Sequence, residues 1–153
     1  AAGNRTVTVE SSATPGATLL TVTPDLVPAT DTSMALAGPA GAMTGLVLND
    51  SNPPVSVGRA QLRVVNVSPD LAAVDVYANF GRIVSGLATN ASSTYILVDA
   101  VIGGSPYRFD INAAGSTTVL LNVPGQTLGS GSVYTLYLLG SGGALSGVLT
   151  QDR

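Results

Sequence analysis

The first third of this chain resembles a second copy of its last third. Residues 36–50 (LAGPAGAMTGLVLND) align without a gap with residues 138–152 (LLGSGGALSGVLTQD), 102 positions further along. Leu, Gly, Gly, Ala, Gly and Asp recur, with Met for Leu and Ser for Thr between them. Residues 52–153 hold a whole unit of this repeat, whereas residues 1–51 hold only its back half. Half a β domain cannot close its own core, so the sequence predicts that the half needs a partner.

Upstream of this segment the repeat is weaker. The same offset aligns Val7 with Phe109, Val9 with Ile111 and Leu19 with Leu121. Few residues are identical there, and a one-residue gap near Leu20 improves the alignment.

The secondary structure is predicted to consist of strands. Apolar runs are short, rich in Val, Leu, Thr and Tyr, and bounded by Gly, Pro, Asn or Asp, and no window keeps a helical period for three turns. The first part predicts strands at Arg5–Glu10, Ala17–Val22, Thr32–Ala37 and Gly45–Asn49. The second predicts strands at Ala60–Asn66, Ala73–Ala78, Arg82–Ser85, Thr94–Val98, Tyr107–Ile111, Thr117–Val123, Val133–Leu139 and Ala144–Thr150.

This regular spacing predicts an all-β fold. We expect a complete immunoglobulin-like antiparallel β-sandwich over residues 59–153 and an additional half-sandwich of about four strands over residues 1–51. Residues 52–58 form a Pro-rich linker between them. Along Val133–Leu139 both faces are apolar, which indicates a central strand.

The composition excludes several classes of function. Only 10% of the residues are charged, the net charge is −3 and Lys is absent, which disfavours nucleic acid and anionic membranes as partners. No apolar run approaches the ~20 residues of a membrane helix. The chain starts Ala-Ala-Gly-Asn without Met, as expected after removal of a signal peptide. We therefore expect an exported protein, extracellular or at the cell surface, unless the start is only a fragment boundary.

Residues 61–77 carry a recognisable motif. The run QLRVVNVSPDLAAVDVY resembles the opening signature of a bacterial family, domain of unknown function 4397: an Arg-Val-Val strand, a Ser-Pro-Asp turn and a Val-Asp-Val-Tyr strand. The resemblance implies a secreted immunoglobulin-like domain over residues ~60–152, often found in tandem, with a partial second copy in residues 1–51. That copy lacks the Ser-Pro-Asp front half. Where the family commonly has His, this chain has Asn66, so no metal or acid–base role of that His transfers.

The side chains available for chemistry are few. His, Cys and Lys are absent, which removes most nucleophiles and neutral-pH bases. A carboxylate pair of the glycosidase kind is conceivable among Asp70, Asp75, Asp99 and Asp110, but their spacing does not support one. We therefore expect no enzyme activity, no catalytic residue, no cofactor and no metal site.

Four polar residues of the motif are predicted to have structural roles. Asp70, with Ser68, is expected to cap the turn after the first motif strand, in preference to binding Ca²⁺. Asp75 is expected to form a cross-strand ion pair with Arg63. The seven aromatic residues all lie in the second part, and we expect them to pack in the core or on the sheet rather than to form a sugar platform.

The leading functional hypothesis is a structural subunit of an extracellular assembly: a filament, pilus-like fibre or surface layer formed from copies of this chain by β-strand complementation. Residues 6–9 are a candidate strand to donate. The candidate subunit-interface residues are Thr6, Val7, Thr8, Val9, Leu19, Leu20, Leu36 and Val47. The alternative is a monomeric surface or adhesion module that binds a glycan or host protein, through loops such as Gly103–Tyr107. A third possibility is a fragment of a two-domain protein.

Overall fold

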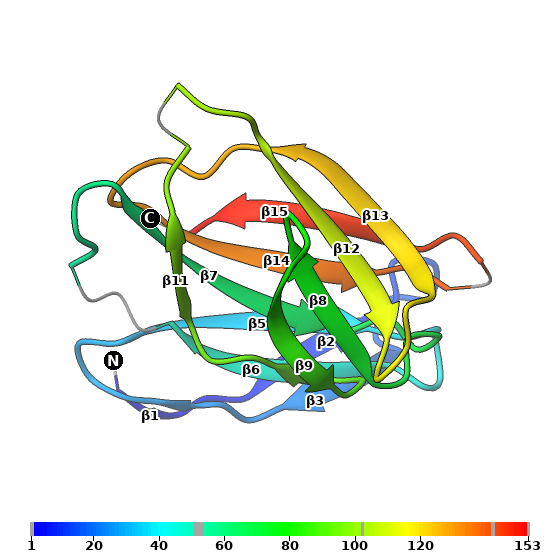
Figure 1. Cartoon of the computed structure of the whole chain (residues 1–153). Coiled ribbons are helices and arrows are strands. Elements are labelled where there is room, and N and C mark those ends of the chain that lie inside the picture. The colour runs from blue at the N-terminus through cyan, green and yellow to red at the C-terminus, as the bar shows by residue number, and fades with distance from the viewer. Residues whose placement is uncertain (1, 51–53, 102, 142, 153) are drawn as a thin grey trace. The chain divides into compact units, whose positions relative to one another are not determined.

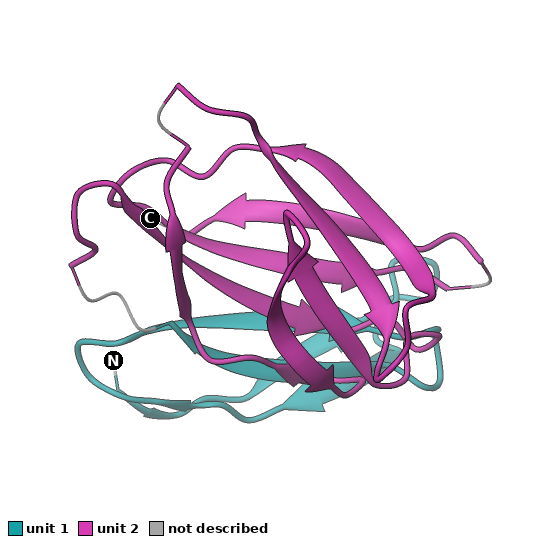
Figure 2. Cartoon of the chain, viewed as in Figure 1, with its two compact units in different colours: residues 1–51 teal, residues 52–153 magenta. Residues whose placement is uncertain are grey.

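The computed structural model describes residues 2–50, 54–101, 103–141 and 143–152, and within these ranges the chain has fifteen strands and no helix (Figure 1). The strands form two compact units, residues 1–51 and residues 52–153 (Figure 2). The all-β prediction is therefore confirmed. Of the predicted linker, residues 52 and 53 lie outside the described ranges, and residues 54–58 form no strand.

Unit 2 (residues 52–153) is a β-sandwich. One sheet has the strand order β10-β7-β14-β15, with β11 also paired to β7, and the other has the order β13-β12-β8-β9. The strands are β7 Arg59–Asn66, β8 Val74–Ala78, β9 Gly81–Leu87, β10 Ala91–Ser92, β11 Ile96–Asp99, β12 Tyr107–Ala113, β13 Val119–Gln126, β14 Val133–Leu139 and β15 Ser146–Gln151. As its two apolar faces predict, β14 is central, between β7 and β15.

Each sheet of unit 2 combines strands from two halves of the sequence. We call β7–β11 the front half and β12–β15 the back half. The halves meet at two strand pairs, which we call the seams: β14 runs parallel to β7, and β12 runs antiparallel to β8. The parallel seam is a departure from the antiparallel sandwich that the sequence predicted.

The core of unit 2 lies between its sheets and draws on both halves. Leu62, Val64 and Val76 from the front half and Phe109 and Leu136 from the back half are all fully buried. Neither half could bury these side chains alone, because each supplies only about half of each sheet.

Unit 1 (residues 1–51) contains three separate strand pairs. Its strands are β1 Gly3–Asn4, β2 Val7–Glu10, β3 Thr18–Val22, β4 Asp25–Leu26, β5 Asp31–Ala37 and β6 Thr44–Asp50. β1 pairs with β4, β2 with β3 and β5 with β6, and no further strand pair joins these among the described residues. The four predicted strands are present, and β1 and β4 are short additions.

One strand boundary shows how tertiary context overrides a local signal. The prediction ended a strand at Val123 because Pro124 and Gly125 follow, but β13 continues to Gln126. β13 is an edge strand paired only with β12, so the missing N–H of Pro124 is tolerated on the free side. The register shift opposite β12 falls in the same segment.

Candidate strand-acceptor site in unit 1

The hairpin β5–β6 has the same register as β14–β15. Leu36 pairs with Gly45 as Leu138 pairs with Gly147, and the matching pairs continue along both hairpins at an offset of 102 residues. The turns also match, because Gly38 and Gly140 both have a positive φ, 100° and 94°. A Cβ atom on either glycine would overlap a backbone oxygen across the turn, so both turns require Gly.

The hairpin β2–β3 likewise corresponds to β12–β13. Val7 pairs with Val22 as Phe109 pairs with Val123, and both hairpins shift register just after Val9 and Ile111. On the second strand the offset is 101, because the unit 1 turn is one residue longer. Leu20, not Leu19, therefore corresponds to Leu121, which places the gap expected near Leu20 inside the turn before β3.

A glycine contact shows that the two hairpins of unit 1 also face one another. A Cβ on Gly45 would lie 2.7 Å from Val22 Cγ2 and 3.2 Å from Leu20 Cδ2. In unit 2 a Cβ on Gly147 would overlap Val123, the counterpart of Val22. Unit 1 therefore has the two-layer arrangement of β12–β15, which makes it the back half of a sandwich.

β2 and β5 of unit 1 correspond to β12 and β14, the back-half strands at the two seams of unit 2. Unlike those strands, β2 and β5 have open edges. β12 is covered by β8 and β14 by β7, whereas β2 pairs only with β3 and β5 only with β6 among the described residues. Open edges present unpaired N–H and C=O groups to which another strand can add.

The inner faces of the two copies differ in burial: side chains of β12 and β14 are covered, and those of β2 and β5 are more exposed. Phe109, Ile111, Leu136 and Leu138 are fully buried in unit 2. Their counterparts Val7, Val9 and Met34 are only partly buried, and Leu36 is 41% exposed. Apolar side chains on this face therefore remain accessible in unit 1.

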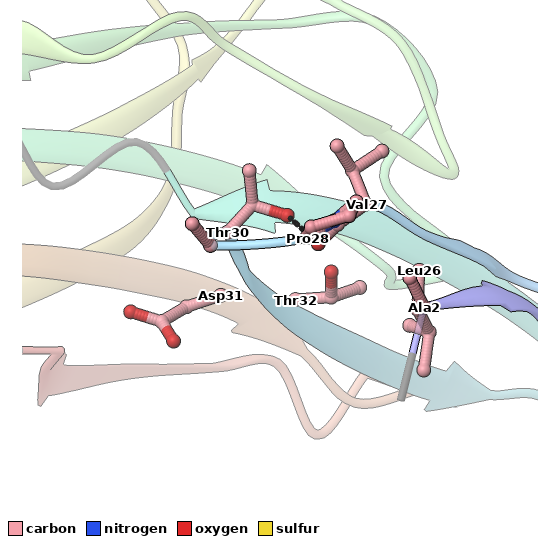
Figure 3. A pocket seen from close by; sticks show the side chains of 8 residues that line it. Ala2, Leu26, Val27, Pro28, Thr30, Asp31 and Thr32 are labelled. Atoms are coloured by element: carbon pink, nitrogen blue, oxygen red, sulfur yellow. Dashed lines mark hydrogen bonds between the residues drawn. The ribbon is translucent and has the colours of Figure 1, made fainter.

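The loop that leads into β5 is exposed over residues 27–30. It lines a hollow of about 500 Å³ in unit 1, formed by Ala2, Leu26, Val27, Pro28, Ala29, Thr30, Asp31 and Thr32 (Figure 3). The hydroxyl of Thr30 donates a hydrogen bond to the Val27 carbonyl (2.9 Å) and fixes the turn, and the Val27 side chain is 51% exposed.

In unit 2 the start of β7 covers the corresponding loop. Gly131 N–H donates to the Arg59 carbonyl (2.8 Å), Gln61 N–H donates to the Ser132 carbonyl (3.0 Å), and Leu128 is fully buried. Ala29 corresponds to Gly131 and has the same left-handed backbone, with φ of 59° against 78°. An alanine pays a steric penalty in this conformation. The hollow therefore lies where a β7-like strand would begin.

The predicted interface residues divide between two faces. Val7, Val9, Leu20 and Leu36 correspond to inner-face positions of unit 2, and Val47 corresponds to Leu149, which packs against the core. Leu19 alternates with Leu20 and lies on the opposite face, so the structure does not bring it to this surface.

The predicted donor segment, residues 6–9, already has a partner. Thr6 precedes β2 and is exposed, while Val7, Thr8 and Val9 belong to β2 and pair with β3. The segment therefore offers one open edge instead of a free strand. The loop Leu26–Thr32 is the part of the surface that sequence reasoning missed, and its only signal was the alignment of Leu26 and Ala29 with Leu128 and Gly131.

The signature motif joins the front half to the back half in unit 2. Ser68 is buried and its hydroxyl donates to the Gly140 carbonyl (2.7 Å) in the β14–β15 turn, while Val67 N–H donates to the Leu138 carbonyl (3.1 Å). Asn66, in the place of the family's His, donates from Nδ2 to the Leu71 and Ala72 carbonyls and accepts the Ser68 N–H. Asn66 thus holds the turn that presents Ser68.

Asp75 holds the second seam. Its carboxylate accepts the Gly86 N–H (2.8 Å) from β9 and the Gly115 N–H (3.1 Å) from the β12–β13 turn. These hydrogen bonds, the Gly86 one first, keep the pKa of Asp75 below its usual value, and the Arg82 guanidinium 3.6 Å away acts in the same direction.

The predicted Arg63–Asp75 ion pair is wrong. β7 and β8 lie in different sheets, so Arg63 and Asp75 are not cross-strand neighbours. Arg63 instead donates to the Thr135 hydroxyl (3.0 Å) and lies 3.9 Å from the Asp152 carboxylate.

The other acidic residues do not gather into one site. Asp70 is exposed in the Pro69-Asp70 turn, Asp99 pairs with Arg59 (2.6 Å), and Asp110 pairs with Arg108 (2.9 Å). Within the described ranges no three or more acidic residues are grouped as a metal site would require. No helix in that part of the chain is long and apolar enough to cross a membrane.

Comparison with known proteins places this architecture in a family. Residues 1–77 and residues 60–153 each match the model of DUF4397, a domain of unknown function. The chain belongs to the DUF4397 family. Both matches include residues 60–77, which carry the Ser-Pro-Asp turn and most of β7 and β8.

One solved structure that matches the chain is the C-terminal domain of AlgF from P. aeruginosa. It is 21% identical in sequence, with a TM-score of 0.42, and the match covers 62% of this DUF4397 chain and 99% of that domain. No curated protein matches the chain.

Proposed function

We propose that this DUF4397 chain is a non-enzymatic structural subunit of an extracellular assembly, and that subunits associate by β-strand complementation at unit 1. The observation that carries the proposal is the half-sandwich itself. Unit 1 repeats the register, turn glycines and glycine contact of β12–β15, yet the strands equivalent to β7 and β8 are absent from it among the described residues.

The free energy available for association comes from two sources. Burying a Val or Leu side chain contributes about 1.5–3 kcal/mol, and Val7, Val9 and Leu36 are the inner-face residues to be covered. Backbone hydrogen bonds along β2 and β5 add to this and fix the register of the incoming strand. Low charge favours such an interface, because few ionised side chains need to be desolvated.

The front half of unit 2 is not available as the added strand. Among the described residues this front half already pairs with β14 and β12 within unit 2. Donating it to a neighbour would open as many seams as it closes. The open edges that unit 1 itself offers are those of β2 and β5. We propose that copies of this chain associate edge to edge, with β2 of one unit 1 adding to β5 of the next. Because these edges differ, the contact does not close on itself and grows into a filament or layer.

The test compares two chains by size exclusion with light scattering and by negative-stain microscopy. The chain as it stands is expected to form particles that grow with concentration. A chain in which residues 54–106 are repeated ahead of residue 1 is expected to be monomeric, because its added front half closes both seams internally.

A matched pair of variants locates the contact. Leu36→Asp places a charge on the inner face of unit 1 and is expected to abolish association, whereas Leu97→Asp alters a 54% exposed residue of unit 2 and leaves it intact. A stable compact monomer of the unaltered chain at micromolar concentration would contradict the proposal. It would favour instead the monomeric surface module.

A further inference from the structure

A second feature, on unit 2, is independent of strand complementation. Phe80 forms the tip of the β8–β9 hairpin and is 80% exposed. The expectation that every aromatic side chain packs in the core or on the sheet is wrong for this residue.

The backbone at Phe80 is held in a conformation that disfavours it. Asn79 and Phe80 form a two-residue turn between the paired residues Ala78 and Gly81, with φ of 45° and 72°. Turns of this kind favour Asn at the first position and Gly at the second, because both φ values are positive. A bulky aromatic residue there is strained, and such strain is typical of functional positions.

The turn is fixed against β12. Asn79 N–H donates to the Arg108 carbonyl (3.0 Å), and Asn79 Oδ1 accepts the Arg108 N–H (2.9 Å). The Arg108 guanidinium lies 5.8 Å from the centre of the Phe80 ring and donates through Nε to Asp110 Oδ1 (2.9 Å). Phe80 is therefore an exposed aromatic surface on a rigid support.

Beside Phe80 lies a hollow of about 330 Å³ on the outer face of the sheet. Its lining residues are Tyr77, Phe80, Arg108, Asp110, Asn112, Thr117 and Val119. Asn122 Nδ2 also donates to Asp110 Oδ1 (2.6 Å), the same oxygen that accepts from Arg108. Asn112 is 92% buried, and its Oδ1 has no hydrogen-bond donor in the described structure. A buried acceptor without a donor is uncommon. This oxygen is covered by neighbouring protein atoms, so it is not a contact point for a ligand in the hollow.

We infer that this hollow binds a neutral sugar ring. A pyranose has one face of C–H groups, which suits Phe80 and Val119, and a rim of hydroxyl groups, which suits Asp110 and Thr117. The ion pair of Arg108 with Asp110 leaves the hollow without a net charge, so an anionic sugar gains little there. The site is specific to unit 2, because the positions in unit 1 that match Arg108, Asp110 and Asn112 hold Thr6, Thr8 and Glu10.

Titration calorimetry with four hexasaccharides tests the inference: maltohexaose, cellohexaose, chitohexaose and, as an anionic control, hexagalacturonate. Saturable binding of at least one neutral probe is expected, with a Kd of about 1 mM or below. No binding of any neutral probe up to ~10 mM, or binding of hexagalacturonate alone, would overturn the inference.

The decisive variant is Phe80→Gly. Glycine is the residue that this turn position favours, so the variant is expected to keep or raise the midpoint temperature of unfolding while weakening binding at least tenfold. Val57→Ala, at a 93% exposed position, is the control and is expected to leave binding unchanged. Binding that is equally strong in Phe80→Gly would show that Phe80 does not form the site.

Discussion

The back half of unit 2 and the whole of unit 1 are one structure in two environments. β12–β15 and the strands β2, β3, β5 and β6 share their pairing register, their turn glycines and the contact of a glycine beneath a valine. They differ in what lies beyond the seams. Strands β7 and β8 cover one copy, and no described strand covers the other. The comparison teaches that this four-strand arrangement forms from its own hairpins, whereas a closed core requires the front half.

The largest difference is expected from truncating the same leucine in each copy. Leu138→Ala should destabilise unit 2 by about 2–5 kcal/mol, because Leu138 is fully buried. Leu36→Ala should cost unit 1 only about 0.5 kcal/mol, since the side chain is 41% exposed. Denaturant unfolding followed by tyrosine fluorescence reports on unit 2, which holds all five tyrosines, and hydrogen exchange reports on unit 1. Equal costs would mean that unit 1 has a closed core after all.

The paired glycines should give the next largest effect. Gly147→Ala overlaps Val123, which is 6% exposed in a packed core, and should cost about 1–3 kcal/mol. Gly45→Ala meets Val22, which is only partly buried and has room to turn, so the cost should be smaller. Thermal unfolding and hydrogen exchange of the two variants measure this difference. A larger loss of stability for Gly45→Ala than for Gly147→Ala would contradict the open core of unit 1.

A smaller effect is expected from removing the hydroxyl that joins the halves of unit 2. Ser68→Ala leaves the Gly140 carbonyl without this donor and should cost roughly 0.5–1.5 kcal/mol. Unit 1 should be unaffected, because its Gly38 has no such donor among the described residues. Denaturant midpoints of the variant and the unaltered chain give the measurement, and an unchanged midpoint would show that the motif serine does not stabilise the seam.

The smallest effect is a pH dependence of unit 2. The pKa of Asp75 is lowered in the folded state. In the unfolded chain it is that of an ordinary aspartate, about 3.9. Its contribution to stability is therefore fully present above that unfolded value and is lost as the pH falls through the lower, folded value. Midpoint temperatures between about pH 6 and pH 2.5 should fall for the unaltered chain and fall less for Asp75→Asn. Identical pH profiles would show that Asp75 does not anchor the seam.

Much of the fold could be predicted from the sequence. Period-two patterns and turn residues located the main strands, and the apolar faces of Val133–Leu139 identified the central strand. The half-repeat could be detected because the β5–β6 and β14–β15 turns share glycines. These turns require Gly for steric reasons, so the glycines match between the two copies where most other residues differ.

Other features depend on partners distant in the sequence. Arg63 and Asp75 are separated by a strand crossover to the opposite sheet, which spacing alone does not reveal. The left-handed backbone of Ala29 and the exposure of Phe80 run against residue preferences, so no propensity rule could have located them. These two departures mark the two surfaces for which we propose binding.

The central claim is that strands from a neighbouring subunit complete unit 1. Amide hydrogen exchange of β2 and β5, compared with β12 and β14 across a dilution series, tests it most directly. In the dilute monomer, the account predicts fast exchange for the N–H groups of β2 and β5 that point to the open edges. Their protection should rise with particle mass. The N–H groups of β12 and β14 should stay protected at every dilution. Protection of β2 and β5 equal to that of β12 and β14 in a dilute monomer would contradict the account.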